Sequence, residues 1–358
     1  MRQNQLKVKD MAAPTMQALV KTARGRGHVE LKDMPVPEPG HGEVLIRVKA
    51  AGVCATDVHI QKDRFPNTPP MIMGHEFAGE VVKAGPGVAG IGPGDPVVSE
   101  NNPFACATCR ICQLGYPNMC PQKRAMGIHS DGCFADYVRL PANLLHRIPA
   151  GVTFEAAALS EPLAVAVNAV EDRGAIQRGD TVVVMGPGAI GLLAAQVARA
   201  EGAQSVLLVG TRRDEELRLS CARRMGLETA IVETDAIAER VAKATGGVGA
   251  DMVIEASGAR AAITMGIALL RRGGRMVVTG ITGQSEIPVN WDGMVGKGLS
   301  LLFSYSSRRR NWDKALGYLG GGHVDTQPLI THRMKLAQWP AAFQALTAQQ
   351  SIRTVFTF

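Results

Sequence analysis

The stretch Thr181–Gly191, TVVVMGPGAIG, decides the fold of this chain. Its first five residues are uncharged and mostly β-branched, which is typical of a buried strand. A Gly-x-Gly-x-x-Gly turn follows, formed by Gly186, Pro187, Gly188, Ala189, Ile190 and Gly191. Gly186 permits a tight bend, Gly188 lets the backbone approach a pyrophosphate, and Gly191 lets the next helix pack closely. A strand, this turn and a helix predict a dinucleotide site at the helix N-terminus. The alternative is a glycine connection needed only for packing.

The residues around this motif alternate between strands and helices. Strands are expected at 181–185, 205–209, 250–255, 275–279 and 299–305. Helices are expected at 156–170, 190–201, 214–225, 260–270 and near 311–319. Because helices of about ten or more residues separate most of these strands, the sheet should be parallel and doubly wound.

The flanking segments have a different texture. Residues 16 to about 150 hold short apolar runs between Gly, Pro and Asp turns, which is typical of β-rich structure, and the C-terminal residues are mixed in the same way. The predicted fold class is therefore α/β. A doubly wound domain at residues 165–303 lies inside a discontinuous β-rich domain made of residues 16–164 and 304–358. Residues 1–15, polar and without the apolar core of a secretory signal, are expected to be a disordered extension.

The composition is that of a folded two-domain protein. The chain has 358 residues, 46% of them hydrophobic, which is more than one core usually supports. Its 39 basic and 32 acidic residues give a net charge of +7, but both signs are scattered. Residues 181–198 carry no charge, yet the Gly-Pro-Gly in their middle argues against a membrane span. We therefore expect no nucleic-acid partner and no membrane partner.

The turn after the second strand of the α/β unit bears on the choice of cofactor. It contains Gly210, Thr211, Arg212 and Arg213, with no carboxylate at the strand end to bind a ribose hydroxyl. Two guanidinium groups there suit a 2′-phosphate, so the sequence favours NADP over NAD. Solvated arginines at an exposed helix start are the alternative. The nearby Asp214 keeps NAD open.

Four of the seven cysteines lie within fifteen residues, at Cys106, Cys109, Cys112 and Cys120. Four thiolates fill the tetrahedral positions of a zinc ion and leave none for a substrate, so this site should be structural. An iron–sulfur cluster and disulfides are the less favoured alternatives. The other thiols, Cys133 and Cys221, are expected to have no special role.

A second set of possible metal ligands comes from three separate motifs. They are Cys54 in GVCATDVH, His75 and Glu76 in GHE, and Glu161 in SEPL. Together with the four cysteines and the glycine turn, these motifs make the chain resemble the zinc-dependent medium-chain alcohol dehydrogenase family. The resemblance covers residues 16–358 and is closest to the polyol and threonine dehydrogenase branch. It implies a GroES-like catalytic domain, a Rossmann domain and a catalytic zinc in the cleft between them.

The resemblance also implies roles for single residues. Cys54 and His75 would be zinc ligands, with Glu76 and Glu161 as the other candidates, one of which yields to water or substrate. Asp57 would orient His75 through its ring N–H. Thr56 and His59 would form a proton relay from the substrate hydroxyl to solvent. Plain loop hydrogen bonding is the alternative for these two residues.

Two residues depart from the pattern of polyol dehydrogenases. Ser304, between Phe303 and Tyr305, stands where the branch has an arginine, and Asn168 stands where it often has histidine. Sorbitol-like specificity therefore does not carry over by motif. The run Arg308–Arg310 either binds an anionic substrate or is a solvated surface.

The sequence thus predicts a cytoplasmic, zinc-dependent, NAD(P)-linked dehydrogenase that acts on a small secondary alcohol such as a polyol, sugar or hydroxy-acid derivative. Two zinc ions per chain are expected, and the resemblance implies a homotetramer or homodimer. One alternative is an NADPH-dependent zinc aldehyde or ketone reductase. A more remote alternative is a non-enzymatic zinc protein that binds nucleic acid.

Overall fold

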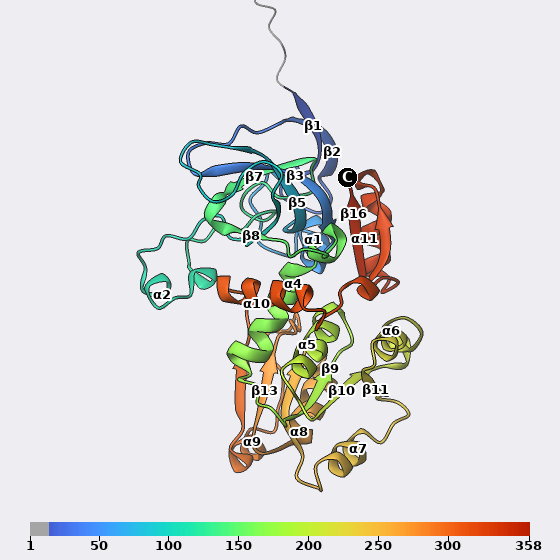
Figure 1. Cartoon of the computed structure of the whole chain (residues 1–358). Helices are drawn as coiled ribbons and strands as arrows, with labels where there is room; N and C mark the ends of the chain where they lie inside the picture. Colours follow the sequence, from blue (N-terminus) through green and yellow to red (C-terminus); the bar gives the residue numbers. More distant parts are fainter. Residues whose placement is uncertain (1–13) are drawn as a thin grey trace, which may run out of the picture.

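The computed structural model describes residues 14–358 (Figure 1). Most of the extension expected at residues 1–15 thus lies outside the described residues, and the first strand, β1, begins at Thr15. The chain forms two main sheets, one in the upper and one in the lower half of Figure 1, with helices α4 (Ser160–Val167) and α10 (Arg309–Gly320) between them.

The upper sheet has seven strands and joins the two ends of the chain. Its order is β15-β16-β3-β5-β6-β8, with β7 paired to β3. The bounds are β3 Glu43–Gly52, β5 Glu76–Ala84, β6 Pro96–Ser99, β7 Tyr137–Pro141, β8 Leu145–Arg147, β15 Ile330–Met334 and β16 Arg353–Thr357. Strand β16 is antiparallel to β3, so the C-terminal strand completes the N-terminal sheet.

Smaller elements surround this sheet. A three-stranded sheet consists of β1 (Thr15–Lys21), β2 (Val29–Pro35) and β4 (Met71–Ile72). Helices α1 (Ala55–Gln61), α2 (Arg110–Gln113) and α11 (Trp339–Thr347) complete this part of the molecule. In Figure 1, α2 lies in a loop that extends away from the sheet.

The lower sheet is parallel throughout, as the alternation of strands and helices predicted. Its order is β11-β10-β9-β12-β13-β14. The strands are β9 Thr181–Met185, β10 Ser205–Gly210, β11 Glu228–Ile231, β12 Ala250–Glu255, β13 Leu270–Val278 and β14 Ser300–Phe303. The helices are α5 Ala189–Ala200, α6 Ser220–Arg224, α7 Ile237–Ala244, α8 Arg260–Leu269 and α9 Trp291–Lys297. The strand order reverses at β9, where ligands bind in doubly wound sheets.

Some predicted elements differ from those observed. The sequence did not predict β11 or α7. The helix expected at 214–225 begins as short 3₁₀ and π turns and becomes α-helical only at Ser220. The helix expected at 156–170 is divided into α3 (Phe154–Ala157), α4 and a π-helical turn at Asn168–Arg173.

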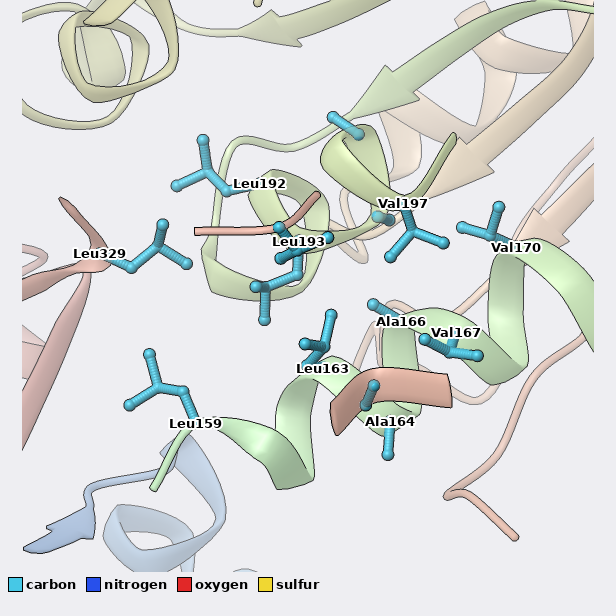
Figure 2. Packing of buried hydrophobic residues seen from close by; sticks show 14 of the residues in the cluster. Leu159, Leu163, Ala164, Ala166, Val167, Val170, Leu192, Leu193, Val197 and Leu329 are labelled. Carbon is cyan, nitrogen blue, oxygen red and sulfur yellow. The ribbon is translucent and has the colours of Figure 1, made fainter. Parts of the chain in front are cut away.

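Helix α4 packs into the largest core. Several of its buried residues, among them Leu163, Ala166 and Val167, belong to a cluster that includes Leu193 and Val197 of α5. Figure 2 shows the side chains of the two helices filling the space between them. The alanines of α4 allow close approach of its neighbours, so the position of Glu161 in its first turn is firmly set.

None of the helices within residues 14–358 is long and apolar enough to cross a membrane.

Candidate functional site

Three of the predicted metal ligands converge in the upper half of the molecule. Cys54 caps the N-terminus of α1, His75 precedes β5, and Glu76 begins that strand. One ligand atom from each lies within 4.8 Å of the others. His75 is 5% exposed and Glu76 is 1% exposed. A sulfur, a nitrogen and an oxygen donor in such a setting fit a zinc ion with a further position left open.

Asp57 contacts His75 on the side away from this cluster. Its Oδ1 atom lies 3.4 Å from His75 Nδ1, and its Oδ2 atom accepts a hydrogen bond of 2.9 Å from Cys54 N. Because Nδ1 faces Asp57, Nε2 is the nitrogen directed toward Glu76, at 4.0 Å from Oε1. Burial alone would lower the pKa of His75, but Asp57 and Cys54 together hold it well above its usual range.

Glu161 lies beside this cluster but outside the group whose ligand atoms converge. Its Oε1 atom accepts a hydrogen bond of 2.8 Å from Asn101 Nδ2. Burial and the charge of Glu76 raise the pKa of Glu161 to about 7. Of the two candidate carboxylates, Glu76 is therefore the one that the fold brings to Cys54 and His75. Nothing in the sequence around Asn101 indicated its contact with Glu161.

Sequence reasoning also missed Arg353 in β16. Its Nη1 atom lies 3.1 Å from each carboxylate oxygen of Glu76 and donates to Val53 O at 3.2 Å. Arg353 is buried, and 277 residues separate it from Glu76. Local sequence patterns carry no signal for a contact of this separation.

The two residues of the predicted proton relay, Thr56 and His59, both lie on α1, directly after Cys54. Thr56 is half-buried and His59 is exposed. A proton relay through these two residues stays a prediction.

The four cysteines of the predicted structural site also converge. The Sγ atom of Cys106 lies 3.5 Å from that of Cys120 and 4.0 Å from that of Cys112, and Cys109 Sγ lies 4.0 Å from Cys120 Sγ. These separations are close to about 3.8 Å, the edge of a tetrahedron with zinc–sulfur bonds of about 2.3 Å. Backbone N–H groups donate to the sulfurs, as in Cys109 N to Cys106 Sγ at 3.3 Å. All seven cysteines are free thiols, with Cys133 and Cys221 buried.

The loop that carries these cysteines rests on the segment after β14. Asn118 Nδ2 donates to Tyr305 O at 3.1 Å, and Lys123 Nζ donates to the Tyr305 hydroxyl at 3.0 Å. The guanidinium of Arg308 lies 4.8 Å from the ring centre of Tyr116. The cysteine loop is thus attached to the junction of the two halves of the molecule.

A cavity of about 580 Å³ lies at the carboxyl edge of the lower sheet. Its lining includes most of the predicted cofactor residues, namely Gly186, Pro187, Gly188, Gly210, Thr211 and Arg213. Ala189, Ile190 and Gly191 instead form the first turn of α5. Arg212 is not among the lining residues.

Glycine is present at positions 188 and 191 of the turn for different structural reasons. A Cβ atom on Gly191 would lie 1.9 Å from Gly186 O, so the fold itself requires glycine there. A Cβ atom on Gly188 would meet nothing within 4 Å. The packing of the protein therefore does not explain Gly188, whereas a phosphate approaching the backbone does.

Asp214, the residue that kept NAD open, is held within the protein. Its Oδ2 atom accepts hydrogen bonds from Thr211 N at 3.0 Å and Thr211 Oγ1 at 2.8 Å, and its Oδ1 atom accepts from Arg218 Nη1 at 2.7 Å. Burial opposes the charge, but these donors hold the pKa of Asp214 below its usual range. Asp214 also lines the nucleotide cavity, but these hydrogen bonds hold its carboxylate to the turn.

The two departures from the polyol pattern contact each other. Asn168 Nδ2 donates to Ser304 Oγ at 3.1 Å and to Ser306 O at 2.9 Å. The run Arg308–Arg310 is mostly engaged within the protein, because Arg308 and Arg310 both form ion pairs with Asp172. Arg309 forms one with Glu100 at 3.0 Å. Because these ion pairs engage the three arginines within the protein, they favour neither an anionic-substrate site nor a run of arginines that only contacts solvent.

Comparisons with known proteins agree with this arrangement. The family model "Alcohol dehydrogenase GroES-like domain" matches residues 40–150, and the model "Zinc-binding dehydrogenase" matches residues 189–319. The sorbitol dehydrogenase of Halalkalibacterium halodurans is 40% identical over 96% of this chain and 99% of that protein. The L-threonine 3-dehydrogenase of Bacillus licheniformis is 35% identical over 95% of this chain and 98% of that protein.

The solved structures give the same picture. A zinc-binding dehydrogenase from Sinorhizobium meliloti, bound to NADP, is 32% identical with a TM-score of 0.89, covering 96% of this chain and 100% of the other. The predicted pair of GroES-like and Rossmann domains is thereby confirmed. The chain belongs to the zinc-dependent medium-chain alcohol dehydrogenase family, in its polyol and threonine dehydrogenase branch, and is an NAD(P)-linked oxidoreductase.

Proposed function

We propose that this chain transfers a hydride between a small secondary alcohol, of the polyol, sugar or hydroxy-acid type, and NAD(P). The observation that carries the proposal is the convergence of half-buried Cys54 with buried His75 and Glu76, in a chain that also has a separate nucleotide cavity. The C-terminal segment connects the two, since Gln349 lines the cavity and Arg353 contacts Glu76.

In this proposal Cys54, His75 and Glu76 hold a catalytic zinc ion, and the four clustered cysteines hold a structural one. A zinc ion at the first site supplies a Lewis acid that stabilises the alkoxide form of the substrate. The convergence of the ligand atoms supports both assignments. Asp57 Oδ1, at 3.4 Å from His75 Nδ1, favours a proton on that nitrogen, which would leave Nε2 available as a ligand.

The proton of the alcohol leaves through the chain's own residues. Thr56 accepts the proton from the substrate hydroxyl as it releases its own hydroxyl proton, and His59, exposed on α1, takes up the released proton and passes it to solvent. Of the three cluster residues, His75 and Glu76 are buried and Cys54 is half-buried. Hydride transfer to the nicotinamide ring is then the chemistry of the cofactor.

The proposed cofactor preference is for NADP. Arg213 lines the nucleotide cavity together with Gly210 and Thr211. Asp214, already bound by Thr211 and Arg218, does not offer a free carboxylate to a ribose hydroxyl. Both features support a site that admits a 2′-phosphate.

We further propose a homodimer or homotetramer in the cytoplasm. Strand β14 lies at the edge of the six-stranded sheet, and large apolar side chains nearby are exposed, including Trp291 at 69%, Val295 at 66% and Phe303 at 66%. Exposed sheet edges with apolar neighbours are commonly covered by another chain. Seven free thiols suit a reducing compartment.

The test combines metal analysis with a substrate screen. The purified protein should contain about two zinc ions per chain, and Cys54→Ser should retain one and lose turnover. A panel of sugar alcohols and hydroxy acids, followed by nicotinamide absorbance, should identify an oxidised secondary alcohol. Initial rates in both directions then separate a dehydrogenase from the NADPH-dependent carbonyl reductase. If Cys54→Ser kept full zinc content and full activity, the assignment of the catalytic site would be wrong.

A further inference from the structure

A carboxylate reaches the nucleotide cavity from a strand that the sequence did not predict. Strand β11 lies parallel to β10, with Ile231 opposite Gly210. The pairing continues beyond the strand, because Val232 N donates to Gly210 O at 2.9 Å. The carboxyl ends of both strands therefore open at the same edge, and Glu233 follows directly, among the residues that line the cavity.

Glu233 has a defined position at this edge. Its Oε2 atom accepts a hydrogen bond of 3.0 Å from Arg212 N. It lines the same cavity as Thr211 and Arg213, the residues of the turn after β10. The acidic residue that the sequence offered near that turn was Asp214, which Thr211 and Arg218 engage, and the structure adds Glu233 from the segment after β11.

We propose that Glu233 determines the balance between NAD and NADP at this site. Its carboxylate is placed to accept a hydrogen bond from an unmodified ribose hydroxyl and to repel a 2′-phosphate. The inference rests on the proposed nucleotide function of this cavity. Arg213 attracts the phosphate and Glu233 opposes it, so NADP binds less tightly than the arginines alone would allow.

The other charges at this edge leave that role to Glu233. Asp214 forms an ion pair with Arg218 at 2.7 Å, which neutralises both groups. Arg212 contributes its backbone N–H to Glu233. Glu233 itself is exposed, so its side chain can turn toward solvent when a phosphate enters. Binding of the phosphate then loses the hydrogen bond from Arg212 N to Glu233 and retains some repulsion between the two negative charges.

The test uses two nucleotide fragments that differ only at the ribose 2′ position, 5′-AMP and 2′,5′-ADP, titrated into the zinc-loaded full chain by calorimetry. Glu233→Gln keeps the size of the side chain and an oxygen that can accept from Arg212 N. We expect 2′,5′-ADP to bind this variant about tenfold more tightly, while the Kd of 5′-AMP changes by less than about threefold. Glu233→Arg should shift the ratio of the two constants further in the same direction.

The matched control is Asp235→Asn, which removes the same charge from the same segment. Asp235 Oδ2 accepts from Ile231 N at 2.8 Å, and Asp235 is not among the residues that line the cavity. In Asp235→Asn, the ratio of the Kd of 2′,5′-ADP to the Kd of 5′-AMP should stay within about twofold of the native value. An unchanged ratio in Glu233→Gln, or an equal shift in the control, would overturn the role of Glu233. If the native chain bound neither fragment, the proposed nucleotide site itself would fail.

Discussion

Arg353 Nη1 lies 3.1 Å from both carboxylate oxygens of Glu76, although 277 residues separate the two. Both side chains are buried, in β16 and β5 of the same sheet. The C-terminal strand therefore places a positive charge against the carboxylate that lies nearest Cys54 and His75. A buried ion pair of this kind is costly to break, because the charge that remains is neither paired nor hydrated.

Arg353→Met should accordingly destabilise the metal-free protein by about 3–5 kcal/mol, since it leaves Glu76 charged and unpaired. Zinc at the cluster supplies a positive charge to the same carboxylate, so the loss should be smaller in the zinc-loaded protein. Denaturant unfolding of both forms measures this difference. Arg333→Met is the control, because its ion pair with Glu155 is exposed and should contribute at most about 1 kcal/mol. Equal losses in the two variants would contradict the role of the buried pair.

The two glycines of the turn should respond differently to alanine. Gly191→Ala places its Cβ atom against Gly186 O and should cost about 3 kcal/mol of stability. Gly188→Ala meets no protein atom within 4 Å, so its free energy of unfolding should change by less than about 1 kcal/mol. It should nevertheless weaken NADPH binding at least tenfold, because the Cβ atom occupies the approach of the pyrophosphate. Thermal unfolding and fluorescence titration of both variants provide the check, and native NADPH affinity in Gly188→Ala would count against the site.

Much of the lower sheet could be predicted from the sequence. Strands β9 and β12 begin and end where expected, because each is a mostly apolar run of strand length followed by turn residues. The short strand β11, Glu-Thr-Ala-Ile, has no such run, so neither it nor the position of Glu233 could be predicted. Its existence depends on pairing with β10, which only the folded chain supplies.

The candidate site likewise contains residues that the sequence could predict and contacts that it could not. The residue types of Cys54, His75 and Glu76 and the spacing of the four cysteines carry a chemical signal, and the structure brings these residues together. The contacts of Asn101 with Glu161 and of Arg353 with Glu76 carry none, since they depend on tertiary packing. For Asp214 the signal in the sequence was misleading. Its position suggested a ribose contact, whereas its carboxylate accepts hydrogen bonds from Thr211 in the same turn.

The ion pairs of Asp172 should make stability depend on pH. Its Oδ2 atom accepts from Arg310 Nε at 2.8 Å and Asn311 Nδ2 at 2.9 Å. Burial opposes its charge, but Arg310, Asn311 and Arg308 outweigh it and lower the pKa of Asp172. A lowered carboxyl pKa stabilises the fold above the unfolded value of about 4, and this stabilisation is lost as the pH falls through the folded value.

Asp172→Asn should therefore cost about 2 kcal/mol at pH 7, and its difference from the native protein should shrink below about pH 4. Urea unfolding between about pH 2.5 and about pH 7, in steps of about half a pH unit, measures this change. The exposed Asp292 provides a control, because its charge acts only in the first turn of α9 and Asp292→Asn should cost at most about 1 kcal/mol. A pH-independent difference for Asp172→Asn would show that lost packing, not charge, causes the effect.

The hydrogen bond between Asn168 and Ser304 should couple the two residues energetically. Asn168→Ala removes a buried donor to Ser304 Oγ and Ser306 O and should cost about 2 kcal/mol. Ser304→Ala should cost about 0.5–1 kcal/mol, since Ser304 is only half-buried. The double variant should be more stable than the sum of the single losses predicts, by about 0.5–1 kcal/mol. Additive losses in this double-mutant cycle would mean that the two residues act independently.

The cysteine loop should show ordered reactivity when zinc is removed. Hydrogen bonds from Cys109 N and Thr108 lower the pKa of Cys106 to about 6, while burial and the neighbouring thiols raise that of Cys112 to about 12. At pH 7, Cys106 is therefore mostly thiolate and should react first with iodoacetamide, with Cys112 far slower. Mass-spectrometric mapping over time measures the order, and the buried Cys133 and Cys221 act as internal unreactive controls. Added zinc should protect all four clustered cysteines, because a metal-bound thiolate is no longer free to attack. Equal rates at Cys106 and Cys112 would contradict the asymmetry of the loop, and labelling undiminished by zinc would contradict a four-thiolate site.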